Sequence, residues 1–182
     1  MGEATPLLSL RGITKRFGAL VANDDIDLDL QRGEMLALLG ENGAGKTTLM
    51  NILFGHYTAD EGSIEIDGAP LPPGSPKAAL GAGLGMVHQH FTLADNMSVV
   101  DNIMVGVEPL TRFRRNTAAA VAKIRALAER YEMDVSPYSL VKHLSVGQRQ
   151  RVEILKALYR HTRILILDEP TAVLTPQESD HL

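Results

Sequence analysis

The chain has 182 residues, with 45% hydrophobic and 22% charged residues, an ordinary composition for a globular protein and not for a disordered one. Its formal net charge of −4 provides no overall basic field, so we expect no nucleic-acid partner. The absence of cysteine excludes disulfides and thiolate metal sites. The N-terminus does not resemble a signal peptide, and no apolar run approaches the ~20 residues that cross a bilayer, so we expect a chain that is soluble on its own.

The first third of the chain alternates between strand patterns and one helix. Apolar and polar residues alternate up to about residue 35 and again from Gly62, which predicts half-exposed strands, the later one in a hairpin. Residues 34–39 are continuously apolar, as in a strand buried on both faces. The next segment has a helical pattern that ends at Gly55, a typical stop residue, and residues 70–76 read as a loop.

From Thr92 to Arg160 the pattern becomes helical. Asn116 is a candidate cap for one helix, whose apolar face would comprise Val121, Ile124, Leu127 and Tyr131. A second helix is expected after residue 145, with Val152, Leu155 and Leu158 on one face. The last element, RILILDEP, is predicted to be a fully buried strand that runs into an acidic pair.

The segment GENGAGKT at 40–47 has the phosphate-loop pattern between a predicted strand and a predicted helix. Small residues allow backbone N–H groups to converge on phosphate oxygens, while a lysine contacts the β and γ phosphates and a hydroxyl can bind Mg²⁺. The nucleotide-binding candidates are Gly40, Asn42, Gly43, Ala44, Gly45, Lys46, Thr47 and Thr48. The glycines at 81–85 form a weaker run that we interpret as a close-packed loop.

Two carboxylates follow the final predicted strand. Asp168 is a candidate for the Mg²⁺ shell, and Glu169 for the base or orienter of an attacking water. A solvated turn is the alternative for such a pair, and the phosphate loop elsewhere in the chain favours the catalytic interpretation.

A second anion-binding pattern, LSVGQ at 144–148, lies where a helix is expected to begin. Together with the phosphate loop, Gln89 in VHQHF and ILILDEP at 164–170, it makes the chain closely resemble the ATP-binding cassette of ABC proteins, over nearly its whole length. In that family two cassettes close head to tail around two ATP molecules, so the signature of one contacts the γ-phosphate held by the other. The resemblance therefore explains why one chain has two phosphate-binding patterns.

The resemblance implies the remaining roles by position. Ser145, Gly147 and Gln148 would contact the partner's nucleotide, and Gln89 would link Mg²⁺ or the catalytic water to the helical lobe. Lys46 and Gln89 would join Glu169 as catalytic residues, with Thr47, Gln89 and Asp168 around the metal. Phe17 stands where the family stacks an aromatic ring on adenine; burial in the core is the alternative.

Two other patterns favour structural interpretations. His88 and His90 form an HxH pair without further ligands nearby in sequence, which favours packing or hydrogen bonding over a metal site. The basic cluster RFRR at 112–115 reads as a solvated connection.

The chain departs from the family pattern at three points. Val146 replaces the glycine usual in the middle of the signature, and Thr175 stands where the family usually has aspartate. The family's switch histidine lies beyond the strand that would follow residue 182, so no residue here is assigned that role, and we expect this chain to bind nucleotide but hydrolyse it poorly.

The fold class implied is α/β: a P-loop NTPase core with an N-terminal antiparallel β subdomain and an inserted helical subdomain, lacking its C-terminal strands. Residues 1–91 and 161–182 would form the core, and residues 92–160 the helical signature subdomain. The resemblance is strongest to the ATPases of importers for simple sugars or nucleosides, here the first of two cassettes. The alternatives are a non-transport ABC ATPase, associated with ribosomes or DNA, and a nucleotide-binding module that does not hydrolyse ATP.

The resemblance also implies ATP and Mg²⁺ as cofactors. Expected partners are a second cassette, in a homodimer or in the same polypeptide, and transmembrane permease subunits that would hold the chain at the cytoplasmic face of the membrane.

Overall fold

The computed structural model describes residues 5–88, 91–105, 107 and 117–168. These residues divide into two compact units, an N-terminal unit (Met1–Leu84) and a C-terminal unit (Gly85–Leu182), each considered by itself. Gln89, His90, Asn116, Glu169 and Thr175 lie outside the described residues, as does the basic cluster at 112–115. Within the described part of the chain, no helix has the length and apolar character needed to span a membrane.

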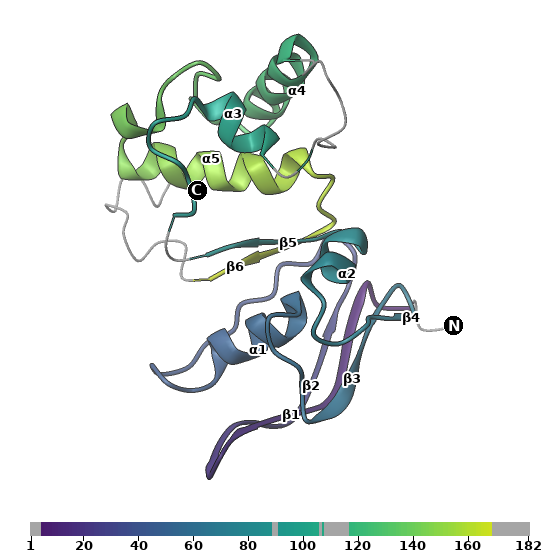
Figure 1. The fold of residues 1–182 in the computed structure, drawn as a ribbon. Coiled ribbons are helices and arrows are strands. Elements are labelled where there is room, and N and C mark those ends of the chain that lie inside the picture. The colour runs from purple at the N-terminus through teal and green to yellow at the C-terminus, as the bar shows by residue number, and fades with distance from the viewer. Residues whose placement is uncertain (1–4, 89–90, 106, 108–116, 169–182) are drawn as a thin grey trace. The chain divides into compact units, whose positions relative to one another are not determined.

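The N-terminal unit contains a four-stranded sheet of order β2-β1-β3-β4 (Figure 1). Its strands are β1 (Leu8–Phe17), β2 (Leu20–Leu30), β3 (Glu61–Ile66) and β4 (Ala69–Pro70), all paired antiparallel. Asp67 and Gly68 join β3 to β4 with φ of 51° and 73°, the positive pair that a two-residue hairpin favours. The hairpin predicted from Gly62 is confirmed.

Two helices complete this unit, α1 (Lys46–Phe54) and α2 (Pro76–Gly81). Gly55 ends α1 with φ 84°, as predicted. A Cβ on Gly55 would lie 2.6 Å from the carbonyl carbon of Ser75, so only glycine allows α1 to end against the residue that caps α2. Residues 71–75 connect β4 to α2, consistent with the predicted loop.

The strand predicted over residues 34–39 is wrong for this structure. Residues 35–39 carry no strand assignment, and Met35 and Leu39 are 96% and 91% exposed. A strand requires a neighbour that supplies hydrogen-bond donors and acceptors, and the four-stranded sheet of this unit pairs none of its strands with that segment. An apolar run indicated burial but could not identify a pairing partner.

The C-terminal unit packs three α-helices around an apolar core (Figure 1). They are α3 (Val99–Met104), α4 (Thr117–Arg130) and α5 (Val146–Tyr159), with a 3₁₀ turn η1 (Val141–His143) before α5. Val121 and Ile124 of α4 are buried in this core, as predicted, with Leu127 partly buried against it. Tyr131 lies just beyond α4 and is 44% exposed, so its predicted place on the buried face is wrong.

Strands β5 (Leu84–Val87) and β6 (Ile164–Leu167) pair beside α5, whose Ile154 and Ala157 contact Val87. The strand predicted at β6 is confirmed, but its burial is incomplete, because Leu167 at its end is 39% exposed. The glycine run at 81–85 is only partly a loop, since α2 ends at Gly81 and β5 begins at Leu84. Its predicted close packing is confirmed at Gly85, where a Cβ would lie 2.6 Å from Thr162 Oγ1.

Candidate nucleotide-binding site

The glycine-rich loop at 40–47 lies directly before α1 in the N-terminal unit. Gly43 and Gly45 have φ of 87° and 83°, in the left-handed region that L side chains rarely adopt. A Cβ on Gly45 would stand 2.1 Å from the carbonyl oxygen of Ala22 in β2, so the loop rests against the sheet backbone. A Cβ on Gly40 would lie 3.2 Å from the Cβ of Ala44. Glycine at 45 is therefore needed for the loop to lie against β2, and a side chain at 40 would press on Ala44.

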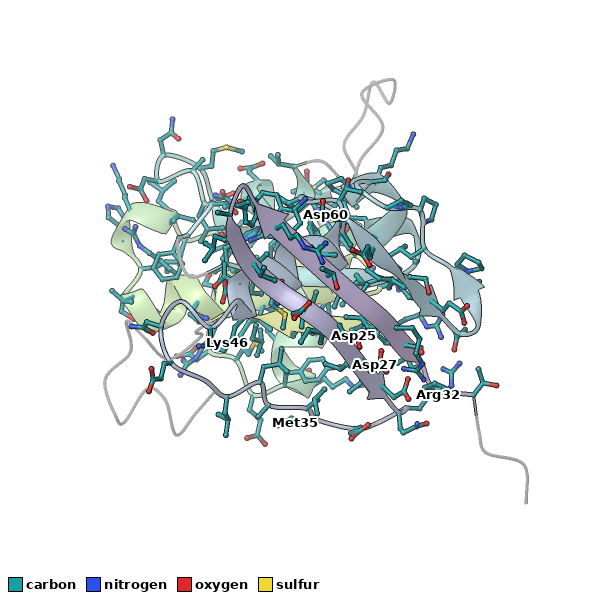
Figure 2. All side chains as sticks on the ribbon, turned by 90° about the horizontal axis from the view of Figure 1, so that it is seen from below. Asp25, Asp27, Arg32, Met35, Lys46 and Asp60 are labelled. Atoms are coloured by element: carbon teal, nitrogen blue, oxygen red, sulfur yellow. The ribbon has the colours of Figure 1, made fainter. Side chains whose placement is uncertain are left out.

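Lys46 is the first residue of α1 and its side chain turns back over the loop (Figure 2). Its Nζ donates to the carbonyl oxygens of Gly40 at 2.6 Å and Glu41 at 2.9 Å. The ammonium therefore lies against the first residues of the loop, close to the N-terminal end of α1, where the helix dipole adds further positive potential. Both features favour a polyanion.

The first turn of α1 also supplies hydroxyl groups. Thr47 is exposed and Thr48 is half-buried, and no acidic side chain occupies this turn. An ammonium, two hydroxyls and a loop of small residues form a donor set that fits the phosphates of a nucleotide with its Mg²⁺. Over the described part of the chain, no group of three or more His, Cys, Asp or Glu side chains is placed to hold a metal ion.

Asn23 of β2 holds the phosphate loop through a hydrogen bond that the sequence did not predict. The residue is 6% exposed, and its Nδ2 donates to the carbonyl oxygen of Gly45 at 3.3 Å. The Oδ1 atom is buried and has no hydrogen-bond partner among the described residues. An asparagine between Ala22 and Asp24 gave no signal, because buried polar side chains cannot be recognised without the fold.

Phe17 ends β1 and is 45% exposed, so within its unit it is not a core residue. Its ring meets that of Tyr57 edge to face at 5.6 Å, and Lys15 Nζ lies 5.4 Å from its centroid. Asp60 fixes this end of the strand by accepting from Lys15 Nζ at 2.9 Å and from the Arg16 backbone N–H at 2.7 Å. These two hydrogen bonds lower the pKa of the Asp60 carboxyl, and the bond from Lys15 has the larger effect.

The signature segment lies in the C-terminal unit at the start of α5. Ser145 Oγ accepts from the Gln148 N–H at 3.2 Å, and Gln148 Oε1 accepts from the Ser145 N–H at 3.1 Å, which together form a capping box. The predicted helix start is confirmed. The Ser145 hydroxyl is exposed and still has a proton to donate, Val146 is 43% exposed and Gly147 is buried.

Asp168 directly follows β6, and its backbone N–H donates to the Val87 carbonyl at 3.1 Å. Asp168 is half-buried, as is His88, the residue after β5. The structure thus brings the loop residues 40–48 together in one unit and Ser145, Gly147 and Gln148 together in the other. Gln89 and Glu169 belong to the predicted site but lie outside the described residues.

The fold and the phosphate loop define an ATP-binding cassette. The family model described as "ABC transporter" matches residues 23–172, and the chain belongs to this family. Among solved structures, the ADP conformation of an ATP-binding cassette of an ABC transporter has a TM-score of 0.85 at 24% identity, covering 97% of this chain and 73% of that one. A nucleotide-free ATP-binding cassette has a TM-score of 0.82 at 24% identity, over 97% and 74%. These similarities show the fold.

Curated relatives are more similar in sequence. The chain is 51% identical to the nucleoside import ATP-binding protein NupA of Lactococcus lactis, over 97% of this chain and 35% of the relative. It is 47% identical to the guanosine import ATP-binding protein NupO of Bacillus subtilis, over 97% and 34%. It is 41% identical to the ribose import ATP-binding protein RbsA of Clostridium perfringens, over 100% and 37%. The chain therefore spans about a third of the length of these relatives.

Proposed function

We propose that this chain is the ATP-binding and ATP-hydrolysing cassette of an importer for simple sugars or nucleosides. The observation that carries the proposal is the loop at 40–47. Gly45 lies against β2, and the Lys46 ammonium donates to the first two carbonyls of the loop. Membership of the ABC transporter family and the import functions named for the relatives support it.

In this proposal each part of the loop binds a different part of Mg-ATP. Lys46 leaves the carbonyls of Gly40 and Glu41 to contact the β and γ phosphates, and the exposed Thr47 hydroxyl binds Mg²⁺. Mg²⁺ neutralises phosphate charge when bound. The half-exposed ring of Phe17 stacks on adenine.

Other residues of the chain contribute to hydrolysis in this proposal. Asp168 and Gln89 join the Mg²⁺ shell, and Glu169 accepts a proton from the attacking water. Ser145, Gly147 and Gln148 contact the γ-phosphate held by a second cassette, for which the exposed Ser145 hydroxyl at the start of α5 is suited. A second cassette and a membrane permease are the proposed partners, which would place the chain at the cytoplasmic face of the membrane. The relatives named for import favour this function over a ribosome- or DNA-associated ATPase.

Calorimetric titration with Mg-ATP tests the nucleotide site. Lys46→Ala should weaken binding by at least about tenfold, because a charge-assisted contact to phosphate is lost. Lys77→Ala, which removes an exposed lysine from α2, is the matched control and should bind as wild type does. Equal affinity of the Lys46 variant and wild type would refute the assignment of this loop.

The transport proposal needs a separate test in cells. Uptake of labelled nucleosides and pentoses should fall when the encoding gene is deleted and return with the wild-type gene but not with Lys46→Ala. Unchanged uptake of both substrate classes would refute the importer assignment while leaving nucleotide binding intact.

A further inference from the structure

A buried carboxylate interrupts the apolar face of α5 in the C-terminal unit. Glu153 is 8% exposed and lies between Val152 and Ile154, which are both buried. A buried carboxylate is costly unless it is hydrogen-bonded. Glu153 Oε1 accepts from the Thr92 backbone N–H at 2.6 Å and from Thr92 Oγ1 at 2.8 Å. One residue of a distant segment therefore satisfies this oxygen twice.

A lysine on the next turn of α5 completes the arrangement. Lys156 Nζ lies 3.5 Å from Glu153 Oε2 and donates to Thr92 Oγ1 at 3.1 Å. The Thr92 hydroxyl thus donates to the carboxylate and accepts from the ammonium, so each group has a consistent role. We refer to Thr92, Glu153 and Lys156 as the Thr92 clamp.

The residues that follow Thr92 are held to η1 and to the first turn of α5. The Asp95 carboxylate pairs with Arg149 at 3.0 Å, and the Asp95 carbonyl accepts from the Lys142 N–H at 3.0 Å. The Met97 carbonyl accepts from the Val141 N–H at 3.1 Å. Separately, the Asn102 side chain of α3 binds both the N–H and the carbonyl of Ala94, at 2.8 Å and 3.1 Å. None of the bonds in this paragraph involves Glu153, so Glu153 contributes to holding this segment through Thr92 alone.

The clamp joins two segments that have separate roles in the proposed function. Gln89 lies shortly before Thr92 in the chain, while Ser145 begins α5, the helix that carries Glu153. We propose that Glu153 is a positioning residue that fixes Thr92 on the signature helix, so that the chain leading from Gln89, which serves this cassette's own nucleotide, is held to the helix that contacts the partner's nucleotide. This inference rests on the proposed function.

An apolar residue at position 153 would suit the surrounding core at least as well as a carboxylate. What it could not do is accept hydrogen bonds from both the N–H and the hydroxyl of Thr92. The carboxylate thus selects Thr92 as the residue that contacts α5 at this point, whereas an apolar side chain would only add to the core.

Backbone amide exchange, measured by NMR on this chain, tests the contact. Glu153→Ala should accelerate exchange of the Thr92 N–H by roughly tenfold or more, because its charged acceptor is removed. The Ala94 N–H is the internal control, since Asn102 is its acceptor, and its exchange should not change. Glu153→Gln keeps an acceptor oxygen and should restore most of the protection at Thr92.

Kinetics of the complete polypeptide test the positioning role. Glu153→Ala should lower kcat for ATP roughly tenfold while KM changes by less than about twofold, and Glu153→Gln should recover most of kcat. Glu129→Ala, an exposed carboxylate on α4, is the matched control. An unchanged kcat, or unchanged exchange at Thr92, would overturn the inference. Failure of the proposed function is distinct, because it appears as absent Mg-ATP binding in wild type.

Discussion

Gly45 shows how one residue shapes the phosphate loop. Its φ of 83° excludes most side chains, and the Ala22 carbonyl occupies the place of its Cβ. Gly43 has a similar φ of 87°, but nothing lies within 4 Å of its Cβ position. A side chain at Gly43 would therefore meet only backbone strain, whereas a side chain at Gly45 would meet both strain and a steric clash.

Substitution of these glycines should give different results. Gly43→Ala should cost about 1 kcal/mol of unfolding free energy, which is the strain of a left-handed alanine. Gly45→Ala should cost at least ~2 kcal/mol and weaken Mg-ATP binding, because the loop must also move away from β2. Urea unfolding and calorimetry of both variants provide the comparison. Equal effects of the two substitutions would show that the contact with Ala22 is unimportant.

Phe17 is the second residue whose role can be measured directly. Phe17→Ala should weaken ATP and GTP binding alike by ~1–2 kcal/mol, since stacking tolerates any purine. Fluorescence competition with both nucleotides gives the two affinities. Unchanged binding with a lowered melting temperature would instead assign Phe17 to packing against Tyr57.

Helix α5 combines a structural and a ligand-binding role at one end. Ser145 caps the helix through Gln148, and the same hydroxyl is proposed to contact the partner's nucleotide. Glycine is nearly as good a cap as serine, whereas alanine is poor. The two substitutions can therefore separate the roles.

Ser145→Ala should lower the unfolding free energy by about 1 kcal/mol, while Ser145→Gly should lower it by only a few tenths. Both should reduce the ATP-dependent association of two cassettes in the complete protein, because both remove the hydroxyl. Thermal unfolding and light scattering with ATP measure the two effects. Full association of the Ser145→Gly variant would show that the hydroxyl does not contact nucleotide.

At the scale of the whole molecule, the residues proposed for nucleotide binding and those proposed for hydrolysis belong to different units of the chain. The phosphate loop belongs to the N-terminal unit, while Asp168 and the signature belong to the C-terminal unit. Binding and hydrolysis should therefore be separable by substitution, because the loop alone provides the main phosphate contacts.

Glu169→Gln should retain ATP binding in the complete protein but slow hydrolysis by at least about a hundredfold, because an amide keeps the shape of the carboxylate without its basicity. Phosphate release measures the rate, and gel filtration with ATP detects the associated cassettes. Hydrolysis at the wild-type rate would assign the base elsewhere.

Local chemistry made much of this protein predictable from its sequence. The glycine spacing at 40–47, the Gly55 stop and the Ser145 helix start are visible over a few residues, because positive φ and helix capping are local preferences, and the structure has the helices where these signals place them. The hairpin after Gly62 follows for the same reason, since Asp67 and Gly68 form a turn by their own conformational preferences.

Only the tertiary structure decided the contacts between distant segments. Residues 34–39 have the pattern of a buried strand, yet strand pairing depends on a neighbour that the pattern does not contain. Asn23 beneath Gly45 and Glu153 against Thr92 join residues that are 22 and 61 positions apart. Polar residues like these carry no periodic signal, because their burial is determined by the hydrogen-bond partner that the fold brings to them.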